Sequence, residues 1–269
     1  MEVLASPVKQ LAAQHGIAIA QPEKIKSNAE FRSQLQAIGP DAIVVVAYGR
    51  IIPQWMIDLP PLGNINLHAS PLPKYRGAAP IQWAIANDES VTGVTTMRID
   101  AGLDTGDMLL RREVTIRDDD TAVTLSARLA ETGAELMVET LRGLDGGTIQ
   151  PQPQDDSQAT LAPLLKKEDG LIDFTRNARE IYNRLRGFQP WPGAFTSFRG
   201  KTLNVWWARP MQAVSLNPGE LRVQDSRMLV GCGEDSALEM LEVQPEGKRR
   251  MSGAEFISGY RPKSGERLG

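Results

Sequence analysis

The chain has 269 residues, 41% of them hydrophobic and 23% charged, which is typical of a soluble globular protein with one or two domains. The net charge is only −3, and a single cysteine, Cys232, excludes both an internal disulfide framework and a cysteine zinc site. The longest apolar run, at residues 42–47, is too short for a membrane span and no signal peptide pattern opens the sequence, so we expect a cytoplasmic protein.

Helical and extended segments alternate through the first half of the chain. A first helix is predicted after Ser6, which caps it, with Pro7 at its first position and Gly16 as its stop. Further helices are predicted at residues 29–39, 79–88 and 121–144, and strands at 41–49, 64–69 and 93–100. Such alternation is typical of βαβ units, so we expect an α/β fold with a mostly parallel sheet.

The second half has a different pattern. Residues 146–160 are polar and rich in Pro, Gly and Gln, and we expect a linker over residues 146–168 between a domain at 1–145 and a domain at 169–269. One helix is predicted at residues 175–188. Short β-branched and aromatic segments follow it, separated by turn residues, at 193–198, 201–208, 219–223, 227–231 and 237–243. Regularly spaced short strands predict a small β-barrel or sandwich.

One strand end combines side chains suited to acyl transfer. Asn66 and His68 are two residues apart in the strand at 64–69, so they share one of its faces. The strand at 93–100 leads into a loop that holds Asp100, Asp104 and Asp107. If the two strands are neighbours, an amide could donate to an oxyanion, an imidazole could move a proton, and the carboxylate of Asp104 could orient the imidazole.

Structural explanations compete with this catalytic interpretation. A histidine near a strand end is more often a hydrogen-bonding residue of the fold than a catalyst, and an aspartate in a glycine-rich turn usually serves the turn. The spacing alone therefore leaves both interpretations open, because the strand order is not known from it.

Residues 64–82, NINLHASPLPKYRGAAPIQ, and residues 93–109, GVTTMRIDAGLDTGDML, closely resemble the folate-dependent formyltransferases. The likeness continues into QPWPGAF and PEGKRRMSG in the second half, and YRGAAPIQ, LDTGDML and SPVKQLA are most similar to the branch that formylates methionyl-tRNA. The resemblance implies a Rossmann-like formyltransferase sheet followed by a small oligonucleotide-binding (OB)-like barrel. It also implies formyl transfer from 10-formyltetrahydrofolate to the α-amino group of initiator methionyl-tRNA, with Asn66, His68 and Asp104 as catalytic residues.

The resemblance also implies how the donor is bound. Residues Ser70, Pro71, Leu72 and Pro73 match the Ser-Leu-Leu-Pro segment that contacts folate in this family. Pro71 replaces a leucine and removes one backbone N–H from that segment. No metal is required for this chemistry, and we expect none.

Basic residues are concentrated toward the C-terminus. Residues 176–269 carry a net charge of +5, against −8 for residues 1–175, which favours contact with a polyanion, although a merely solvated basic surface is the simpler explanation. We expect tRNA phosphates to be contacted by Arg184, Arg186, Lys248, Arg249 and Arg250. Of the adjacent Trp206 and Trp207, one should face the core and the other the surface. We expect a monomer that binds neither DNA nor membrane.

The sequence leaves other functions open. An amino sugar nucleotide is a possible acceptor, since the LPKYRG segment fits that branch too, but such an enzyme has no need of the basic second half. Glycinamide ribonucleotide is less favoured, because chains that formylate it are shorter. A tRNA- or folate-binding protein without strong activity is a third possibility, since members of this family begin with a βαβ unit of roughly 40 residues before the position of Met1. We therefore expect an N-terminally incomplete catalytic domain.

Overall fold

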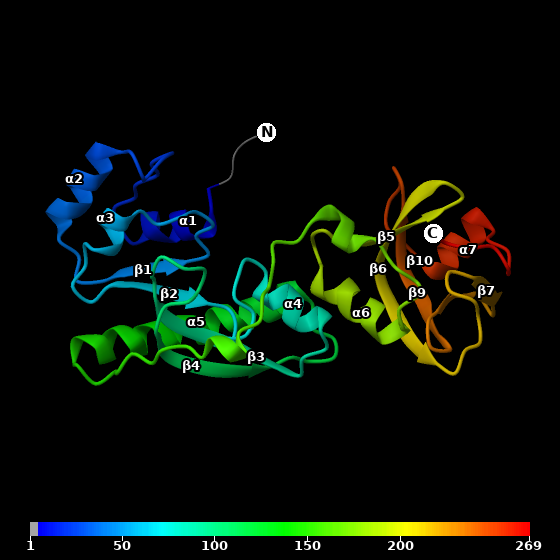
Figure 1. Cartoon of the computed structure of the whole chain (residues 1–269). Coiled ribbons are helices and arrows are strands. Elements are labelled where there is room, and N and C mark those ends of the chain that lie inside the picture. The colour runs from blue at the N-terminus through cyan, green and yellow to red at the C-terminus, as the bar shows by residue number, and fades with distance from the viewer. Residues whose placement is uncertain (1–4) are drawn as a thin grey trace. The chain divides into compact units, whose positions relative to one another are not determined.

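The computed structural model describes residues 5–269, which form two compact units (Figure 1). The first comprises residues 5–43 and 48–64 and holds the helices α1 (Pro7–Gln14), α2 (Ala29–Ile38) and α3 (Gln54–Ile57). The Ser6 hydroxyl accepts a hydrogen bond from the Lys9 N–H at the start of α1, and α2 ends at Gly39 in the left-handed conformation. The predicted cap at Ser6 and the predicted stop at Gly39 are therefore confirmed.

The second unit contains a four-stranded sheet in the order β1 (Ile43–Val46, of which 44–46 belong to this unit), β2 (Asn64–His68), β3 (Val91–Arg98) and β4 (Met108–Thr115). The β2–β3 and β3–β4 pairs are antiparallel, whereas the alternation of helices and strands predicts parallel neighbours. Only nine residues, 99–107, connect β3 to β4, which is too short for the crossover that a parallel pair needs. The broad prediction, an α/β domain followed by a small β domain, is confirmed.

Helix α5 (Ala122–Asp145) packs along β3 and β4 with the apolar face that the sequence predicts (Figure 1). Thr121 caps it in a reciprocal pair with Thr124, and its buried side chains include Leu125, Leu129, Leu136 and Leu144. Gly133 allows close contact with the sheet, because a Cβ there would lie 2.5 Å from Cδ2 of Leu67 in β2. Leu67 therefore points toward α5, and its strand neighbours point to the opposite face.

The small β domain is an antiparallel sheet in the order β5 (Ala194–Phe198), β6 (Lys201–Gln212), β9 (Ser236–Pro245), β8 (Arg227–Cys232) and β7 (Leu221–Gln224). The short β10 (Met251–Ser252) pairs with β9 and leads into α7 (Gly253–Tyr260). Helix α6 (Ala178–Gly187) packs on β6 and also on α4 (Pro80–Ala86), where Trp83 meets Phe188 edge to face. Burial of Cys232 in this core raises the pKa of its thiol to about 12.

The linker, residues 146–168, is hydrogen-bonded to the rest of the unit over much of its length. Gln152 exchanges two backbone hydrogen bonds of 2.8 Å with Met108. Further along, the Arg76 N–H donates to the Thr160 carbonyl (2.8 Å) and the Ala162 N–H to the Arg76 carbonyl (2.7 Å). The linker also contains the short 3₁₀ turn η1 (Asp156–Gln158), and a second 3₁₀ turn, η2 (Lys167–Gly170), begins at its end. The linker is thus an ordered part of the second unit.

Arg186 in α6 is a buried structural residue. Its side chain is 1% exposed and donates to the carbonyls of Arg117 (2.9 Å) and Asp120 (3.1 Å) and to Oδ1 of Asn183. Burial lowers the pKa of the guanidinium, since the charged form loses hydration. The charge pattern of the sequence assigns Arg186 to tRNA phosphates, and the structure differs because internal oxygens occupy its donors.

Among residues 5–269, no helix is long and apolar enough to cross a membrane. The same residues contain no group of three or more His, Cys, Asp or Glu side chains arranged to hold a metal ion.

We predict that Arg186→Ala lowers the free energy of unfolding by about 3 kcal/mol, because it leaves buried carbonyl groups without donors at about 1–3 kcal/mol each. Urea denaturation followed by circular dichroism measures the change. As the control, Lys201→Ala removes an exposed side chain at the start of β6 and should shift stability by no more than about 0.5 kcal/mol. Equal stabilities of the two variants would contradict the structural role of Arg186.

Candidate active site

His68 is held at the end of β2, on the face of the sheet opposite α5. Asn66 lies two residues earlier on that face and is half-buried, while His68 is 6% exposed. The cross-strand partner of His68 is Thr95 on β3. The Thr95 hydroxyl donates to the Ser70 carbonyl (2.7 Å) and accepts from the Leu72 N–H (3.2 Å), so it fixes the start of the loop that follows His68.

A hydrogen bond to one ring nitrogen of His68 determines which of the two nitrogens is available to react. Nε2 of His68 lies 2.9 Å from the backbone carbonyl oxygen of Tyr75. A carbonyl oxygen can only accept, so Nε2 carries a proton in every protonation state that keeps this bond. In the neutral ring, Nδ1 is therefore the free acceptor.

Asp104 faces that free nitrogen from the loop between β3 and β4. Its Oδ2 lies 3.6 Å from Nδ1 of His68 and accepts a hydrogen bond of 2.8 Å from the Gly77 N–H. The Asp104 backbone has φ +52°, a left-handed conformation that aspartate tolerates better than most residues. The loop thus turns back from the end of β3 and brings its carboxylate to the histidine.

His68 Nδ1 and Asp104 Oδ2 can share one proton between them. While the imidazole is neutral, Nδ1 and the carboxylate oxygen are both acceptors, and 3.6 Å is too long for a direct hydrogen bond. A proton on Nδ1, or the N–H of an amine between the two atoms, makes the contact favourable. This arrangement can take a proton from an attacking amine or hold a positive charge beside a developing oxyanion.

The loop that carries Tyr75 is anchored at both its side chain and its backbone. The Tyr75 hydroxyl donates to Glu89 (2.7 Å), and burial together with this carboxylate raises the pKa of the phenol to about 12, so it remains a donor. The Tyr75 backbone has φ +61°, an uncommon value for a bulky residue. Gly77 has φ +121°, and a Cβ there would lie 2.7 Å from the Ala162 carbonyl oxygen, so this position requires glycine.

The expected folate-contacting residues differ in exposure. Ser70 and Leu72 are fully buried, and the Ser70 hydroxyl donates to the Lys74 carbonyl (2.6 Å). Pro71 and Pro73 are half-buried. Only the two prolines therefore offer side-chain surface to a ligand.

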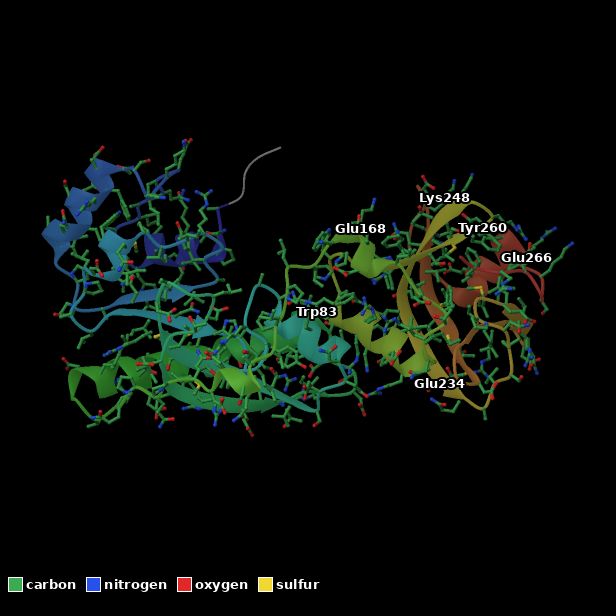
Figure 2. The ribbon with its side chains drawn as sticks, viewed as in Figure 1. Trp83, Glu168, Glu234, Lys248, Tyr260 and Glu266 are labelled. Carbon is green, nitrogen blue, oxygen red and sulfur yellow. The ribbon has the colours of Figure 1, made fainter. Side chains whose placement is uncertain are left out.

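The expected phosphate-contacting residues fall into two groups. Lys248, Arg249 and Arg250 are exposed in the turn between β9 and β10, with Lys248 at the edge of the β domain (Figure 2). The Arg250 guanidinium covers the Trp206 ring, 4.1 Å from its centroid, and lies 3.3 Å from Glu242. Trp207 points inward and meets Tyr182 edge to face. This turn is a basic surface beside a half-buried indole that Arg250 covers on one face.

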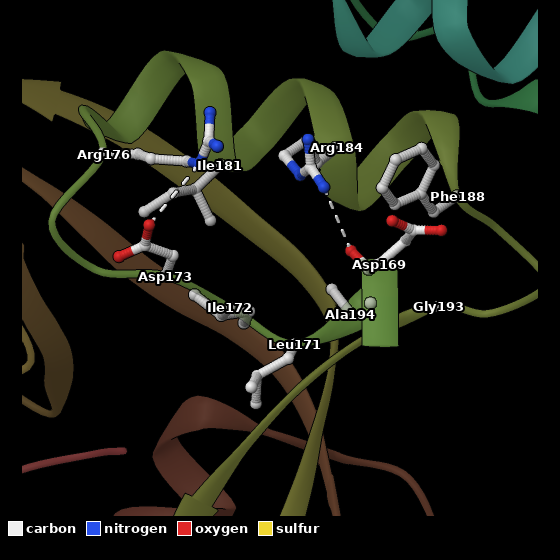
Figure 3. A pocket seen from close by; sticks show the side chains of 11 residues that line it. Asp169, Leu171, Ile172, Asp173, Arg176, Ile181, Arg184, Phe188, Gly193 and Ala194 are labelled. Carbon is white, nitrogen blue, oxygen red and sulfur yellow. Dashed lines mark hydrogen bonds and ion pairs between the residues drawn. The ribbon is translucent and has the colours of Figure 1, made fainter. Parts of the chain in front are cut away.

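Arg184 is half-buried, in contrast to the fully buried Arg186. Its guanidinium lies over the rings of Phe188 (4.9 Å) and Trp83 (5.7 Å) and donates to the Asp169 carbonyl, beside a cavity of about 10 Å³ (Figure 3). Burial lowers the pKa of this guanidinium. The cavity has space for about one water molecule. Arg184 packs η2 against α6 and is only partly accessible.

Three residues of the site carried no signal in the sequence. Thr95 is one of several β-branched residues of a strand, and Gln154 and Thr160 lie in the linker, where Gln and Thr are common. The Thr160 hydroxyl accepts from the Tyr75 N–H (2.8 Å), and the Gln154 amide donates to the carbonyls of Asp104 and Gly106. The linker reaches the loops of Tyr75 and Asp104 only through the tertiary fold, so the sequence does not reveal these contacts.

Comparison with known proteins identifies relatives over nearly the whole chain. The family model described as formyl transferase matches residues 2–141, and the model described as formyl transferase, C-terminal domain, matches residues 164–261. The chain is 65% identical over 264 residues to the methionyl-tRNA formyltransferase of Koribacter versatilis, covering 98% of this chain and 84% of that protein. It is 59% identical over 270 residues to the methionyl-tRNA formyltransferase of Acidobacterium capsulatum, covering 100% and 87%.

A solved structure shares the fold at low sequence identity. The crystal structure of HypX from Aquifex aeolicus in complex with tetrahydrofolic acid superimposes with a TM-score of 0.64 at 20% identity. The match covers 85% of this chain, and this chain spans 40% of that one. The likeness supports the α/β architecture.

We predict that neutral His68 carries its proton on Nε2, because the Tyr75 carbonyl can only accept. Nitrogen-15 NMR of histidine-labelled protein measures the tautomer. The chain has only two histidines, His15 and His68, so His68→Gln assigns the resonances. A neutral ring protonated at Nδ1 would contradict the geometry on which the site depends.

Proposed function

Because the chain belongs to the formyl transferase family, we propose that it transfers a formyl group to the α-amino group of initiator methionyl-tRNA. The observation that carries the proposal is the facing of His68 Nδ1 and Asp104 Oδ2 at 3.6 Å in a chain 65% identical to a methionyl-tRNA formyltransferase. We further propose a cytoplasmic monomer with a catalytic part at residues 1–145, the linker at 146–168 and a tRNA-binding part at 169–269.

The proposed donor is 10-formyltetrahydrofolate. Support comes from the formyl transferase family itself and from the fold shared with a protein whose structure contains tetrahydrofolic acid. Residues 70–73 are the proposed contact segment. Pro71 and Pro73 would offer apolar surface to the donor, while buried Ser70 and Leu72 hold the loop in shape.

The chemistry requires two proton movements and one charge to be stabilised. An α-amino group has a pKa of about 7.7–8.0, so part of it is already the neutral nucleophile near pH 7. Its nitrogen forms a bond to the formyl carbon, and the carbonyl oxygen becomes an oxyanion. Asn66 donates to that oxyanion, and protonated His68 stabilises its charge.

The second half of the reaction breaks the bond between the formyl carbon and the folate nitrogen. The attacking nitrogen releases a proton, for which Asp104 is the acceptor. The departing folate nitrogen gains a proton, and the N–H of His68 at Nδ1 can supply it. His68 and Asp104 thus end with the same total number of protons as at the start, and the products are the formylated amine and tetrahydrofolate.

The basic turn of Lys248, Arg249 and Arg250 is the proposed phosphate contact. Arg249 and Arg250 each have a carboxylate nearby, Glu255 at 3.1 Å and Glu242 at 3.3 Å, while the Lys248 ammonium forms no ion pair with any residue of 5–269. Trp206 is half-buried under Arg250, and a base that displaces this guanidinium can stack on its ring. Arg186 is left out of this contact, because internal oxygens already accept from its donors, whereas half-buried Arg184 makes one hydrogen bond of 3.4 Å and stays a proposed contact.

We predict that Asp104→Asn lowers kcat/KM for methionyl-tRNA by at least about a hundredfold, the usual scale for losing a proton acceptor beside the reacting atoms. A formylation assay with 10-formyltetrahydrofolate measures it, with Asp107→Asn in the same loop as the control. The proposal fails if wild-type protein formylates only an amino sugar nucleotide or nothing, and Asp104 leaves the mechanism if the variant turns over normally.

We predict that Lys248→Ala with Arg249→Ala weakens tRNA binding and reduces the slope of log affinity against log salt by about 1 for each phosphate that the protein no longer neutralises. Filter binding over a salt series measures the slope. Lys263→Ala with Arg209→Ala removes the same charge elsewhere on the β domain as the control. An unchanged slope in the first variant would show that the basic turn does not contact phosphate.

A further inference from the structure

The Gln154 side chain connects the two loops of the proposed active site. Its Oε1 accepts two hydrogen bonds from the Arg76 guanidinium, at 3.0 Å from Nε and 2.8 Å from Nη2. Its Nε2 donates to the carbonyls of Asp104 and Gly106, both at 2.8 Å. The amide has one possible orientation here, because a guanidinium only donates and a carbonyl only accepts.

We propose that Gln154 is a positioning residue that holds the Asp104 carboxylate at the working distance from His68. This inference rests on the proposed function, since it concerns the proton transfer between the substrate amine, Asp104 and His68.

Apart from Gln154, the only hydrogen bond that residues 5–269 make to Asp104 itself from outside its loop is that of the Gly77 N–H to its carboxylate, at 2.8 Å. Asp100 accepts from the Gly102 N–H and the Thr105 hydroxyl, which shapes the loop internally. The Arg98 N–H donates to the Asp107 carbonyl at the base of the loop. Among the described residues, Gln154 alone bonds the backbone carbonyl of Asp104, which sits in the left-handed conformation. Gln154 is therefore the external constraint on the backbone of this turn, while the Gly77 N–H bonds the carboxylate itself.

The other end of the same side chain fixes the loop that orients His68. Arg76 follows Tyr75, whose carbonyl accepts from His68 Nε2 and whose N–H donates to the Thr160 hydroxyl. The backbone of Arg76 pairs with Thr160 and Ala162. The linker thus fixes both neighbours of His68, the Tyr75 carbonyl on one side and the Asp104 carboxylate on the other.

Gln154 carries more of this constraint than the adjacent ion pair. Arg76 is 7% exposed and also contacts Asp156 at 2.7 Å, but the Asp156 side chain is 83% exposed, so solvent screens that pair. Gln154 is half-buried and makes four hydrogen bonds through one rigid amide. A shift of about 1 Å in a catalytic group can lower a rate by about a hundredfold, so an anchor of this kind has a measurable effect on turnover.

Two substitutions separate positioning of Asp104 from anchoring of Arg76. Gln154→Ala removes all four hydrogen bonds. Gln154→Glu has the same shape and still accepts from Arg76, but it turns an oxygen instead of an N–H toward the two carbonyls. Both variants should lower kcat by about ten- to a hundredfold and leave the KM for methionyl-tRNA within about twofold. Gln152→Ala, on the same segment with an exposed side chain, is the matched control and should keep wild-type kinetics.

A measurement without turnover completes the test. The nitrogen-15 resonances of His68 should shift in Gln154→Glu, because the carboxylate opposite Nδ1 moves, while Gln152→Ala leaves them unchanged. Unshifted resonances, or wild-type turnover in Gln154→Glu, would overturn the inference even if Gln154→Ala fails to fold. Absence of formyl transfer by the wild-type protein would instead refute the proposed function, and the resonance shift would still report whether Gln154 positions Asp104.

Discussion

The hydrogen bond from His68 Nε2 to the Tyr75 carbonyl is the constraint on which the proposed site depends. It fixes the proton of the neutral ring on the side away from Asp104, so the nitrogen that faces the carboxylate is an acceptor. Were the ring turned over, Cε1 would face the Tyr75 carbonyl and Cδ2 would face Asp104, so the two residues of the proposed pair could no longer share a proton. The Tyr75 conformation, its buried hydroxyl and its link to Thr160 all serve to keep that carbonyl in place.

The antiparallel sheet gives this site a different construction from the one that strand and helix alternation predicts. In a parallel sheet, two strand ends meet at one edge and their loops are neighbours. Here His68 lies opposite Thr95, three residues before the end of β3, and the loop after β3 turns back to reach it. The strand period alone placed Asn66 and His68 on one face. The position of Asp104 required a loop conformation with positive φ and an anchor in the linker, which local sequence patterns do not encode.

Sequence patterns also do not show which basic residues are exposed to a polyanion, and here the reason is burial. A sequence gives the charge of an arginine but not its burial, and helix α6 carries both Arg184 and Arg186 near its end. Such residues at a helix C-terminus are favourable for the helix dipole whether or not they bind a polyanion. Arg186 is enclosed by carbonyls and Arg184 by aromatic rings, whereas the turn at Lys248 is exposed. Tertiary packing therefore separates structural from available cations.

The sequence predicts that the linker is a connecting segment, but it does not predict the hydrogen bonds that the linker makes. Its Pro, Gln and Gly content predicted a connecting segment, and the structure agrees that no long helix or strand forms there. Composition does not reveal hydrogen bonding, however, and the backbone groups of such a segment must find partners wherever they are shielded from water. Here several of those partners lie in the two loops of the proposed site. A segment that connects the proposed catalytic part to the proposed tRNA-binding part thus contributes to the geometry of the proposed site, because the hydrogen bonds that satisfy its polar groups also fix Tyr75 and Asp104 around His68.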